Sequence, residues 1–132
     1  MKGAVLDSYA VLAFLFQERG HEKVVALLEK AAESDRQLLI AAPNWAEVRY
    51  MVERKVGTEQ WPRTRAKLLG LPLDIVPVDQ ELAEIAGGIK AVKKMSLADC
   101  FAAALAKQKR LEIYTGDREF QAVEKEQKVV WL

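Results

Sequence analysis

Short apolar runs recur along the chain, and each is followed by a longer segment in which apolar and polar positions alternate at helical spacing. The runs cover residues 2–6, 38–42, 73–77 and 111–114, and a weaker one covers 128–131. Each is four or five residues long, the usual length of a buried strand. The pattern therefore predicts four strands and a fifth at the carboxyl end.

The segments between these runs are long enough for helices. Asp7-Ser8 is a helix-start signal after the first run, Pro43 ends the second run, and Pro62 is tolerable only in the first turn of a helix. Strands that alternate with helices within one domain are typical of a parallel sheet covered by helices on both faces. The predicted helices cover residues 9–16, 22–33, 44–55, 58–69, 79–92 and 96–109.

Acidic residues follow the predicted strands. Asp7 comes directly after the first strand, Glu47 lies in the helix after the second, and Asp117 follows the fourth. Asp99 stands in the first turn of the alanine-rich segment Ser96–Ala106, whose composition predicts a buried helix. Because ligands of open parallel sheets bind beyond the carboxyl ends of the strands, these four acids are candidates for one site.

Helix capping offers a second interpretation of the same four acids. Asp7 and Asp117 stand where N-caps stand, and Asn44-x-x-Glu47 and Ser96-x-x-Asp99 resemble capping boxes. Capping explains each acid singly, but it does not require all four to share one edge of a sheet. Both interpretations stay open at the level of the sequence.

A cluster of four acids needs cations, because like charges at ~4 Å repel by about 4 kcal/mol at an effective dielectric near 20. Carboxylates without histidine or thiolate favour Mg²⁺ or Mn²⁺. Metal held by acids suits phosphodiester hydrolysis, and the chain has no G-x-x-x-x-G-K-[ST] loop for a nucleoside triphosphate.

Composition narrows the class of protein further. The 132 residues favour one domain, 1–132, and a net charge of +1 gives no bulk basic field for nucleic acid. One cysteine, Cys100, excludes an internal disulfide, and His21, the one histidine, excludes the usual Cys/His zinc sets. We expect Cys100 to be buried and His21 to lie at the surface. The longest apolar run, residues 9–16, is too short to span a membrane, so a cytoplasmic protein without a membrane partner is expected.

The sequence resembles the PIN-domain ribonucleases, and among them the toxins of the VapBC type. The likeness lies in Asp7-Ser8, in Pro43 with Glu47, in the stretches 96–100 (SLADC) and 115–120 (TGDREF), and in the terminal VVWL. It implies a three-layer α/β/α sandwich with a central parallel sheet, a pocket that binds Mg²⁺ or Mn²⁺, and endonucleolytic cleavage of RNA. It also implies a homodimer and a cognate small antitoxin.

The resemblance carries residue roles with it. Asp7, Glu47, Asp99 and Asp117 match the family's catalytic, metal-binding acids, with Asp7 and Asp99 expected as direct ligands. Ser8 and Thr115 match hydroxyls that orient the acids, and Phe120 matches an aromatic expected to pack. Asn44 and Trp45 depart from the small or hydroxyl residues that are frequent at their positions, which leaves the shape of the substrate groove open. The candidate RNA contacts are Arg118, Lys93 and Lys94.

Three functions remain open from the sequence. The leading one is a metal-dependent endoribonuclease that acts as the toxin of a type II toxin-antitoxin system. The alternatives are a housekeeping RNA-processing nuclease of the same fold and a catalytically silent scaffold that binds a protein partner. Large apolar residues could either complete the core or form a groove for an amphipathic helix of an antitoxin. These residues are Phe14, Phe16, Trp45 and Trp61.

Overall fold

The computed structural model describes residues 2–132 and contains one sheet of five parallel strands. The strand order is β3-β2-β1-β4-β5, so the first strand lies at the centre. Val5 of that strand is aligned with Leu39 on one side and Ile113 on the other. The predicted parallel sheet is confirmed. The strands are β1 (Ala4–Leu6), β2 (Leu38–Ala41), β3 (Leu73–Val76), β4 (Glu112–Thr115) and β5 (Val129–Trp131).

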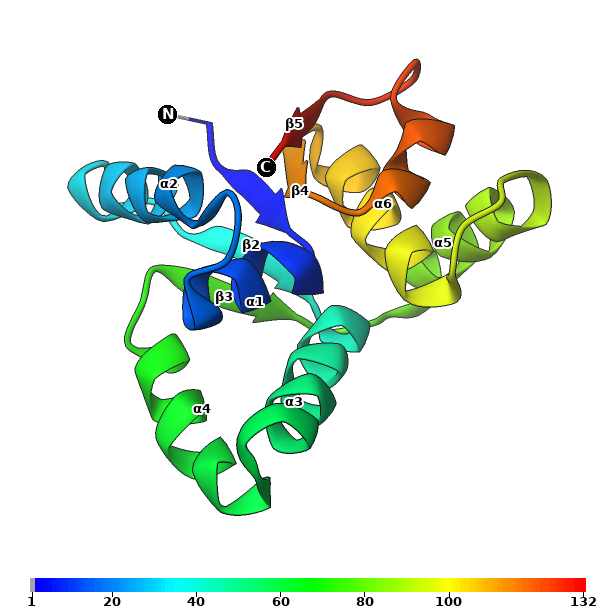
Figure 1. The fold of residues 1–132 in the computed structure, drawn as a ribbon. Helices are drawn as coiled ribbons and strands as arrows, with labels where there is room; N and C mark the ends of the chain where they lie inside the picture. Colours follow the sequence, from blue (N-terminus) through cyan, green and yellow to red (C-terminus); the bar gives the residue numbers. More distant parts are fainter. Residues whose placement is uncertain (1) are drawn as a thin grey trace.

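Helices cover both faces of the sheet, which gives the three-layer α/β/α architecture (Figure 1). Side chains alternate along β1: Ala4 and Leu6 pack in the core under α1 and α2, and Val5 packs under α5 and α6. Phe120 and Cys100 are fully buried on the α6 side, as expected. The helices are α1 (Ser8–Phe16), α2 (His21–Glu33), α3 (Ala42–Val56), α4 (Trp61–Leu69), α5 (Gln80–Val92) and α6 (Leu97–Lys109), with short 3-10 helices η1 (Thr58–Gln60) and η2 (Arg118–Val123).

Two local predictions were wrong in detail. Pro43 does not end the second strand but lies in the first turn of α3, which begins at Ala42. Proline is tolerated there because the first N–H groups of a helix have no intrahelical partner. The predicted helix 58–69 is divided into η1 and α4, with Pro62 in the first turn of α4. The short helix η2, which follows β4, was not expected from the sequence.

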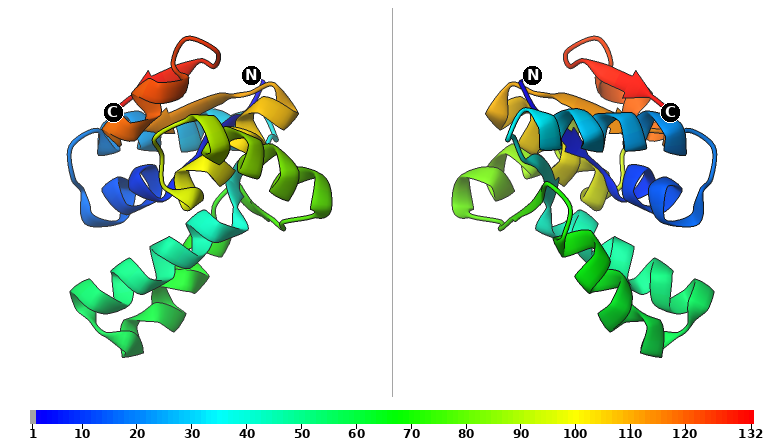
Figure 2. Two further views of the ribbon diagram at one scale, coloured as in Figure 1. Left: turned by 90° about the vertical axis from the view of Figure 1, so that its right-hand side faces the viewer. Right: turned by 90° about the vertical axis from the view of Figure 1, so that its left-hand side faces the viewer.

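Helices α3 and α4 form a hairpin that projects from the body of the molecule (Figure 2). Trp45 of α3 and Trp61 of α4 meet edge to face, with ring centroids 5.4 Å apart. Trp61 is only 6% exposed, so core packing accounts for it. Phe14, Phe16 and Trp45 are half-buried against the same core and keep part of their surface accessible.

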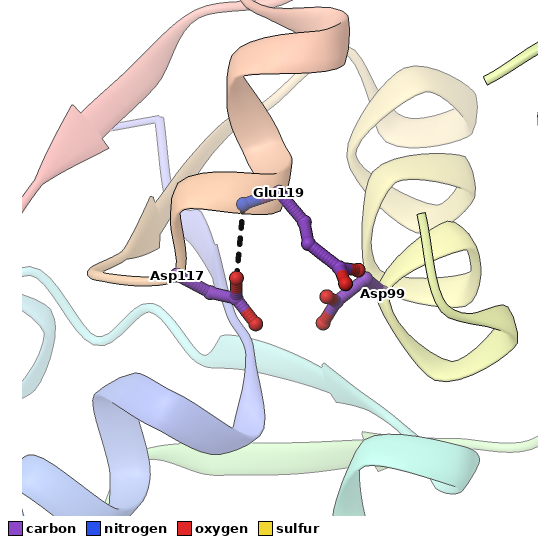
Figure 3. Close-up of side chains that lie close together, drawn as sticks. All are labelled: Asp99, Asp117 and Glu119. Atoms are coloured by element: carbon purple, nitrogen blue, oxygen red, sulfur yellow. Dashed lines mark hydrogen bonds between the residues drawn. The ribbon is translucent and has the colours of Figure 1, made fainter. Parts of the chain in front are cut away.

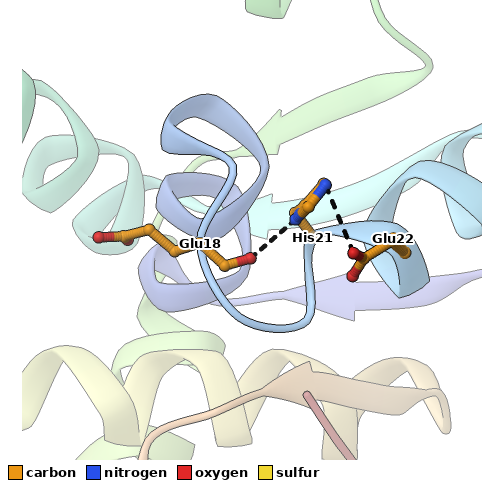
Figure 4. A network of polar contacts seen from close by, with 3 residues as sticks. All are labelled: Glu18, His21 and Glu22. Atoms are coloured by element: carbon orange, nitrogen blue, oxygen red, sulfur yellow. Dashed lines mark hydrogen bonds and ion pairs between the residues drawn. The ribbon is translucent and has the colours of Figure 1, made fainter.

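The turn between α1 and α2 is held by local polar contacts (Figure 4). His21 Nδ1–H donates to the carbonyl oxygen of Glu18 at 2.9 Å, and Nε2 lies 3.7 Å from Oε1 of Glu22. The Glu18 carboxylate also pairs with Lys55 of α3 at 3.4 Å. His21, the first residue of α2, is partly exposed at the surface, as expected. Within residues 2–132, no helix combines the length and apolar character required to cross a bilayer.

The connections from the central strand β1 and from the edge strand β3 cross opposite faces of the sheet. The chain passes from β1 to β2 through α1 and α2 on one face, and from β3 to β4 through α5 and α6 on the other. Because these crossovers depart to opposite sides of β1, the carboxyl ends of β1 and β4 lie at a topological switch point, where ligands of such sheets bind. Asp7 and Asp117 follow these two strand ends.

Candidate functional site

Asp7 links β1 to α1 and is 1% exposed. Its Oδ1 accepts a hydrogen bond from Ala10 N–H at 2.9 Å, which caps α1, and its Oδ2 accepts one from the Thr115 hydroxyl. Burial raises the pKa of Asp7 from 3.8 to about 7, although both hydrogen bonds lower it. The nearby charges of Asp117 and Glu47 raise the pKa further.

Thr115 and Ser8 each hold an acid in place. The Thr115 hydroxyl donates to Asp7 and accepts from the N–H of Asp117 at 2.9 Å, so one side chain connects the ends of β1 and β4. Ser8 donates to Glu47 Oε1 at 2.9 Å. Gly116 keeps this edge closely packed, because a Cβ at that position would collide with the ring of Tyr9.

Asp99 lies in the first turn of α6 and is 5% exposed. Its own N–H donates to Ser96 Oγ at 3.2 Å, so Ser96 provides the helix cap and the Asp99 carboxylate is left for other contacts. The pKa of Asp99 is raised from 3.8 to about 9. Burial is the largest cause, and hydrogen bonding with Glu119 and the charge of Asp117 add to it.

Asp99, Asp117 and Glu119 converge, and an oxygen of each lies within 4.8 Å of the other two (Figure 3). Asp117 Oδ1 accepts from Glu119 N–H at 2.9 Å, and Glu119 Oε1 accepts from Ser96 N–H at 2.7 Å. The hydrogen bond from Ser96, together with Asp99, lowers the pKa of Glu119. Sequence reasoning missed Glu119 because it follows no strand directly. The short helix η2 turns it back toward α6, and the TGDREF stretch was the available signal.

Glu47 enters the site from α3, on the side of Asp7. Besides Ser8, its Oε1 accepts from Asn44 Nδ2 at 3.3 Å. Asn44 is fully buried and also donates to the carbonyl oxygen of Ala98 at 3.1 Å, which ties α3 to the start of α6. Its Oδ1 has no partner within residues 2–132. Asn44 is thus a connector between two helices, and the predicted capping box Asn44-x-x-Glu47 is wrong because α3 begins at Ala42.

The capping interpretation holds for part of the cluster. Asp7 and Asp117 cap α1 and η2, respectively. At α6, Ser96 caps the helix, but the reciprocal bond to Ser96 N–H comes from Glu119 instead of Asp99. Capping therefore gives no reason for the buried position of the Asp99 carboxylate beside two other acids.

The predicted RNA contacts lie in two places. Arg118 is exposed next to Asp117, at the start of η2. Lys93 and Lys94 precede the Ser96 cap, where Lys93 pairs with Glu126 at 2.8 Å and Lys94 is exposed.

The donor set at this edge fits a hard divalent cation. All candidate ligands are carboxylate oxygens, and the raised pKa values of Asp7 and Asp99 reflect buried carboxylates without a compensating cation. Oxygens of Asp99, Asp117 and Glu119 are close enough to share one ion. Asp7 and Glu47 stand outside that group of three, and each accepts hydrogen bonds from the neighbouring residues described above.

Comparison with known proteins identifies the class. The PIN-domain family model matches residues 4–126, and the chain belongs to this family. Members of the family are nucleases, which hydrolyse phosphodiester bonds. A search of the curated proteins finds no match.

Solved structures of similar fold include proteins of toxin-antitoxin systems. A toxin-antitoxin complex from Klebsiella pneumoniae is 26% identical with a TM-score of 0.71, covering 97% of this chain and 96% of that one. DNA-bound VapBC from Salmonella typhimurium is 18% identical with a TM-score of 0.76, covering 98% of both chains. VapC20 of Mycobacterium tuberculosis, a toxin that cleaves the sarcin-ricin loop, is 16% identical with a TM-score of 0.69, covering 92% of this chain and 95% of that one.

Proposed function

We propose that this protein is a Mg²⁺- or Mn²⁺-dependent endoribonuclease and the toxin of a toxin-antitoxin pair. The observation that carries the proposal is the convergence of Asp99, Asp117 and Glu119 at the switch point of the sheet, with Asp7 and Glu47 beside them. Like-charged buried carboxylates destabilise a fold unless a cation or proton compensates them, so this arrangement points to metal binding.

The residues of the site have distinct tasks. Asp99, Asp117 and Glu119 would hold the ion, and Asp7 would complete the site with the lone pairs that its hydrogen bonds leave free. Thr115 and Ser8 fix the orientation of Asp7 and Glu47. Glu47, whose Oε2 has only a long contact of 3.5 Å with the Tyr50 hydroxyl, would accept a proton from an attacking water. The bound cation would neutralise phosphate charge and lower the pKa of a water molecule.

Removal of metal tests this activity. We expect purified protein to cleave 5′-labelled total RNA with Mg²⁺ or Mn²⁺, to lose cleavage in EDTA, and to regain it when either ion is returned in excess. Gel analysis follows the products, and sequencing of the new RNA ends gives the cleavage site. Cleavage that persists in EDTA, and that also persists in an Asp99→Asn preparation made in parallel, would identify a contaminant. Cleavage by the parent alone in EDTA would contradict metal dependence.

The antitoxin part of the proposal is supported by the toxin-antitoxin complex of similar fold and 26% identity. We also propose a homodimer, on the resemblance to the VapBC-type toxins. Phe14, Phe16 and Trp45 offer half-buried apolar surface to an amphipathic helix, whereas buried Trp61 does not. An Arg or Lys beyond that helix could pair with the acidic site and block it, because a guanidinium binds carboxylates bidentately.

Co-expression tests the partner. We expect the product of an adjacent small gene to co-elute with this protein in size-exclusion chromatography and to abolish RNA cleavage, and the free protein to elute as a dimer. Phe14→Glu should release the partner, and Val92→Glu, which changes an exposed residue of α5, should retain it. Separate elution of the parent protein with undiminished cleavage would contradict the pairing.

A further inference from the structure

A basic cleft lies at the amino edge of the sheet, at the opposite ends of the strands from the acidic site. Its volume is about 560 Å³, and it is bounded by the segment before β1, the end of α6 and the start of β4. We refer to it as the amino-edge cleft. The cationic side chains that line it are Lys2, Lys30, Lys107, Arg110 and Lys128.

Most of this positive charge is not neutralised within the protein. The cleft also contains two carboxylates, Glu112 and Glu126. Glu112 pairs with Lys128 at 3.1 Å, and Glu126 pairs with Lys93 at 2.8 Å. In the part of the chain from residue 2 to 132, the remaining four cations form no ion pair, although the whole chain carries a net charge of only +1. A concave surface with four uncompensated cations attracts a polyanion.

Arg110 stands at the rim of the cleft in an uncommon backbone conformation. It occupies the left-handed conformation at the end of α6, with φ 56° and ψ 46°. Glycine or asparagine is favoured at such a position because a Cβ is strained there by roughly 1 kcal/mol. Asparagine therefore removes this cation without disturbing the end of the helix.

A second cavity adjoins this cleft along α5. Its volume is about 450 Å³, it shares Lys107, Glu126 and Gln127 with the amino-edge cleft, and its lining includes Lys93. Lys93 stands three residues before Ser96, whose N–H binds Glu119 of the acidic cluster. The two cavities thus adjoin each other beside α5 and α6.

The length of α6 sets the least distance between the acidic site and the cleft. Asp99 and Arg110 are eleven residues apart, which corresponds to about 16 Å along a helix axis at ~1.5 Å per residue. An RNA strand that reaches from the acids to the cleft must pass over the surface and therefore spans at least this distance.

We infer that the amino-edge cleft is a binding site for the phosphate backbone of RNA, at least about 16 Å from the point of cleavage. This inference rests on the proposed nuclease function for its geometry, but binding to the cleft is measured separately from cleavage. The cleft would add affinity for long substrates and leave the chemistry at the acids unchanged.

The test compares two charge-matched double variants. Lys107→Gln with Arg110→Asn removes two cations from the cleft, and asparagine tolerates the left-handed conformation. Lys109→Gln with Arg65→Gln is the control, because both residues are exposed and lie outside both cavities. Lys109 also lies in the last turn of α6, as Lys107 does. Circular dichroism melting curves verify that both variants are folded.

Binding is followed in EDTA by fluorescence anisotropy with a labelled 24-nucleotide single-stranded RNA and a 4-nucleotide RNA. Each phosphate contact contributes about 0.7 to the slope of log Kd against log salt for single strands, so the cleft variant should lower the slope for the 24-mer by about 1.4. The control variant should retain the slope of the parent, and the 4-mer should bind weakly to all three proteins. Equal loss in both variants would overturn the inference.

Two competitors distinguish other occupants. Displacement of the 24-mer by inorganic phosphate at the same ionic strength would show a small-anion site and overturn the assignment to RNA. A poly-glutamate peptide whose binding is lost only in the cleft variant, with binding of the 24-mer intact, would assign the cleft to a protein partner.

Cleavage assays with two substrates distinguish a failure of this inference from a failure of the proposed function. With Mn²⁺, the cleft variant should hydrolyse bis(p-nitrophenyl) phosphate at the parent's rate and cleave the 24-mer with a kcat/KM at least about tenfold lower. If the parent hydrolyses neither substrate but the cleft variant still binds the 24-mer with the expected lower salt slope, the nuclease function is refuted and the cleft is retained. A cleft variant that cleaves the 24-mer as fast as the control would refute the cleft and keep the nuclease.

Discussion

Asp99→Asn should reduce metal-dependent RNA cleavage by at least about 100-fold. Asparagine keeps the shape of the side chain but removes the negative charge that a divalent cation requires. Metal ions contribute several kcal/mol of transition-state stabilisation, and about 2.7 kcal/mol corresponds to 100-fold in rate. Asp7→Asn, Asp117→Asn and Glu119→Gln should also lose activity, because these carboxylates lie in or beside the same cluster.

The matched control is Asp79→Asn. Asp79 caps α5 by accepting from Leu82 N–H at 2.8 Å, and asparagine caps helices equally well. It stands outside the acidic cluster, so its variant should cleave RNA at the parent's rate. Initial rates on one RNA substrate at saturating Mn²⁺ make the comparison. An Asp99→Asn protein as fast as the Asp79→Asn protein would contradict the assignment of the site.

Asp99→Asn should stabilise the protein in the absence of metal. The pKa of Asp99 is raised to about 9 in the folded state from 3.8, so the folded protein binds a proton that the unfolded chain has released. Stability therefore falls as pH rises above about 4 and continues to fall until pH passes the folded-state value. The pKa of Asp7 is raised to about 7, so Asp7 also lowers the stability as pH rises, but over a narrower pH range.

Asp99→Asn removes the loss of stability that ionisation of Asp99 causes, which is larger than the loss caused by Asp7. In EDTA at pH 8 we expect its Tm to exceed that of the parent by at least about 3 °C, roughly the shift that 1 kcal/mol produces in a domain of this size. The difference should become small near pH 4, because there the parent carboxyl is protonated in the folded state and close to half protonated in the unfolded chain. Added Mn²⁺ should raise the Tm of the parent far more than that of the variant.

Thermal unfolding by circular dichroism between pH 4 and pH 9 measures this effect. A clear loss of stability in Asp99→Asn would favour a purely structural role for the carboxylate. Ser96→Ala is the control for capping, because Ser96 Oγ accepts from Asp99 N–H, and its loss should lower Tm at every pH. The two variants therefore separate the cap from the acidic cluster by the sign of their effects.

Long periodic segments and strand ends could be recognised from the sequence. The apolar run at residues 2–6 predicts a strand, and the alanine-rich run after Ser96 predicts a helix, because an element that is buried on all sides has few polar positions. The position of Asp7 directly after a strand was sufficient to place it at the carboxyl edge. Helix starts near proline were less certain, since Pro43 is compatible both with a strand end and with a first helical turn.

The sequence by itself determined the order of strands and helices along the chain, because this order follows from local periodicity. It also determined the parallel sheet and the four acids near its carboxyl edge, because parallel strands share one direction. Only the tertiary structure decided which acids meet. Glu119 joins Asp99 because η2 folds back to the Ser96 cap, a contact between residues 23 positions apart. The amino-edge cleft likewise combines α2, α6 and β4, whose separation along the chain hides their shared charge. Long-range packing sets such contacts, and no local pattern records them.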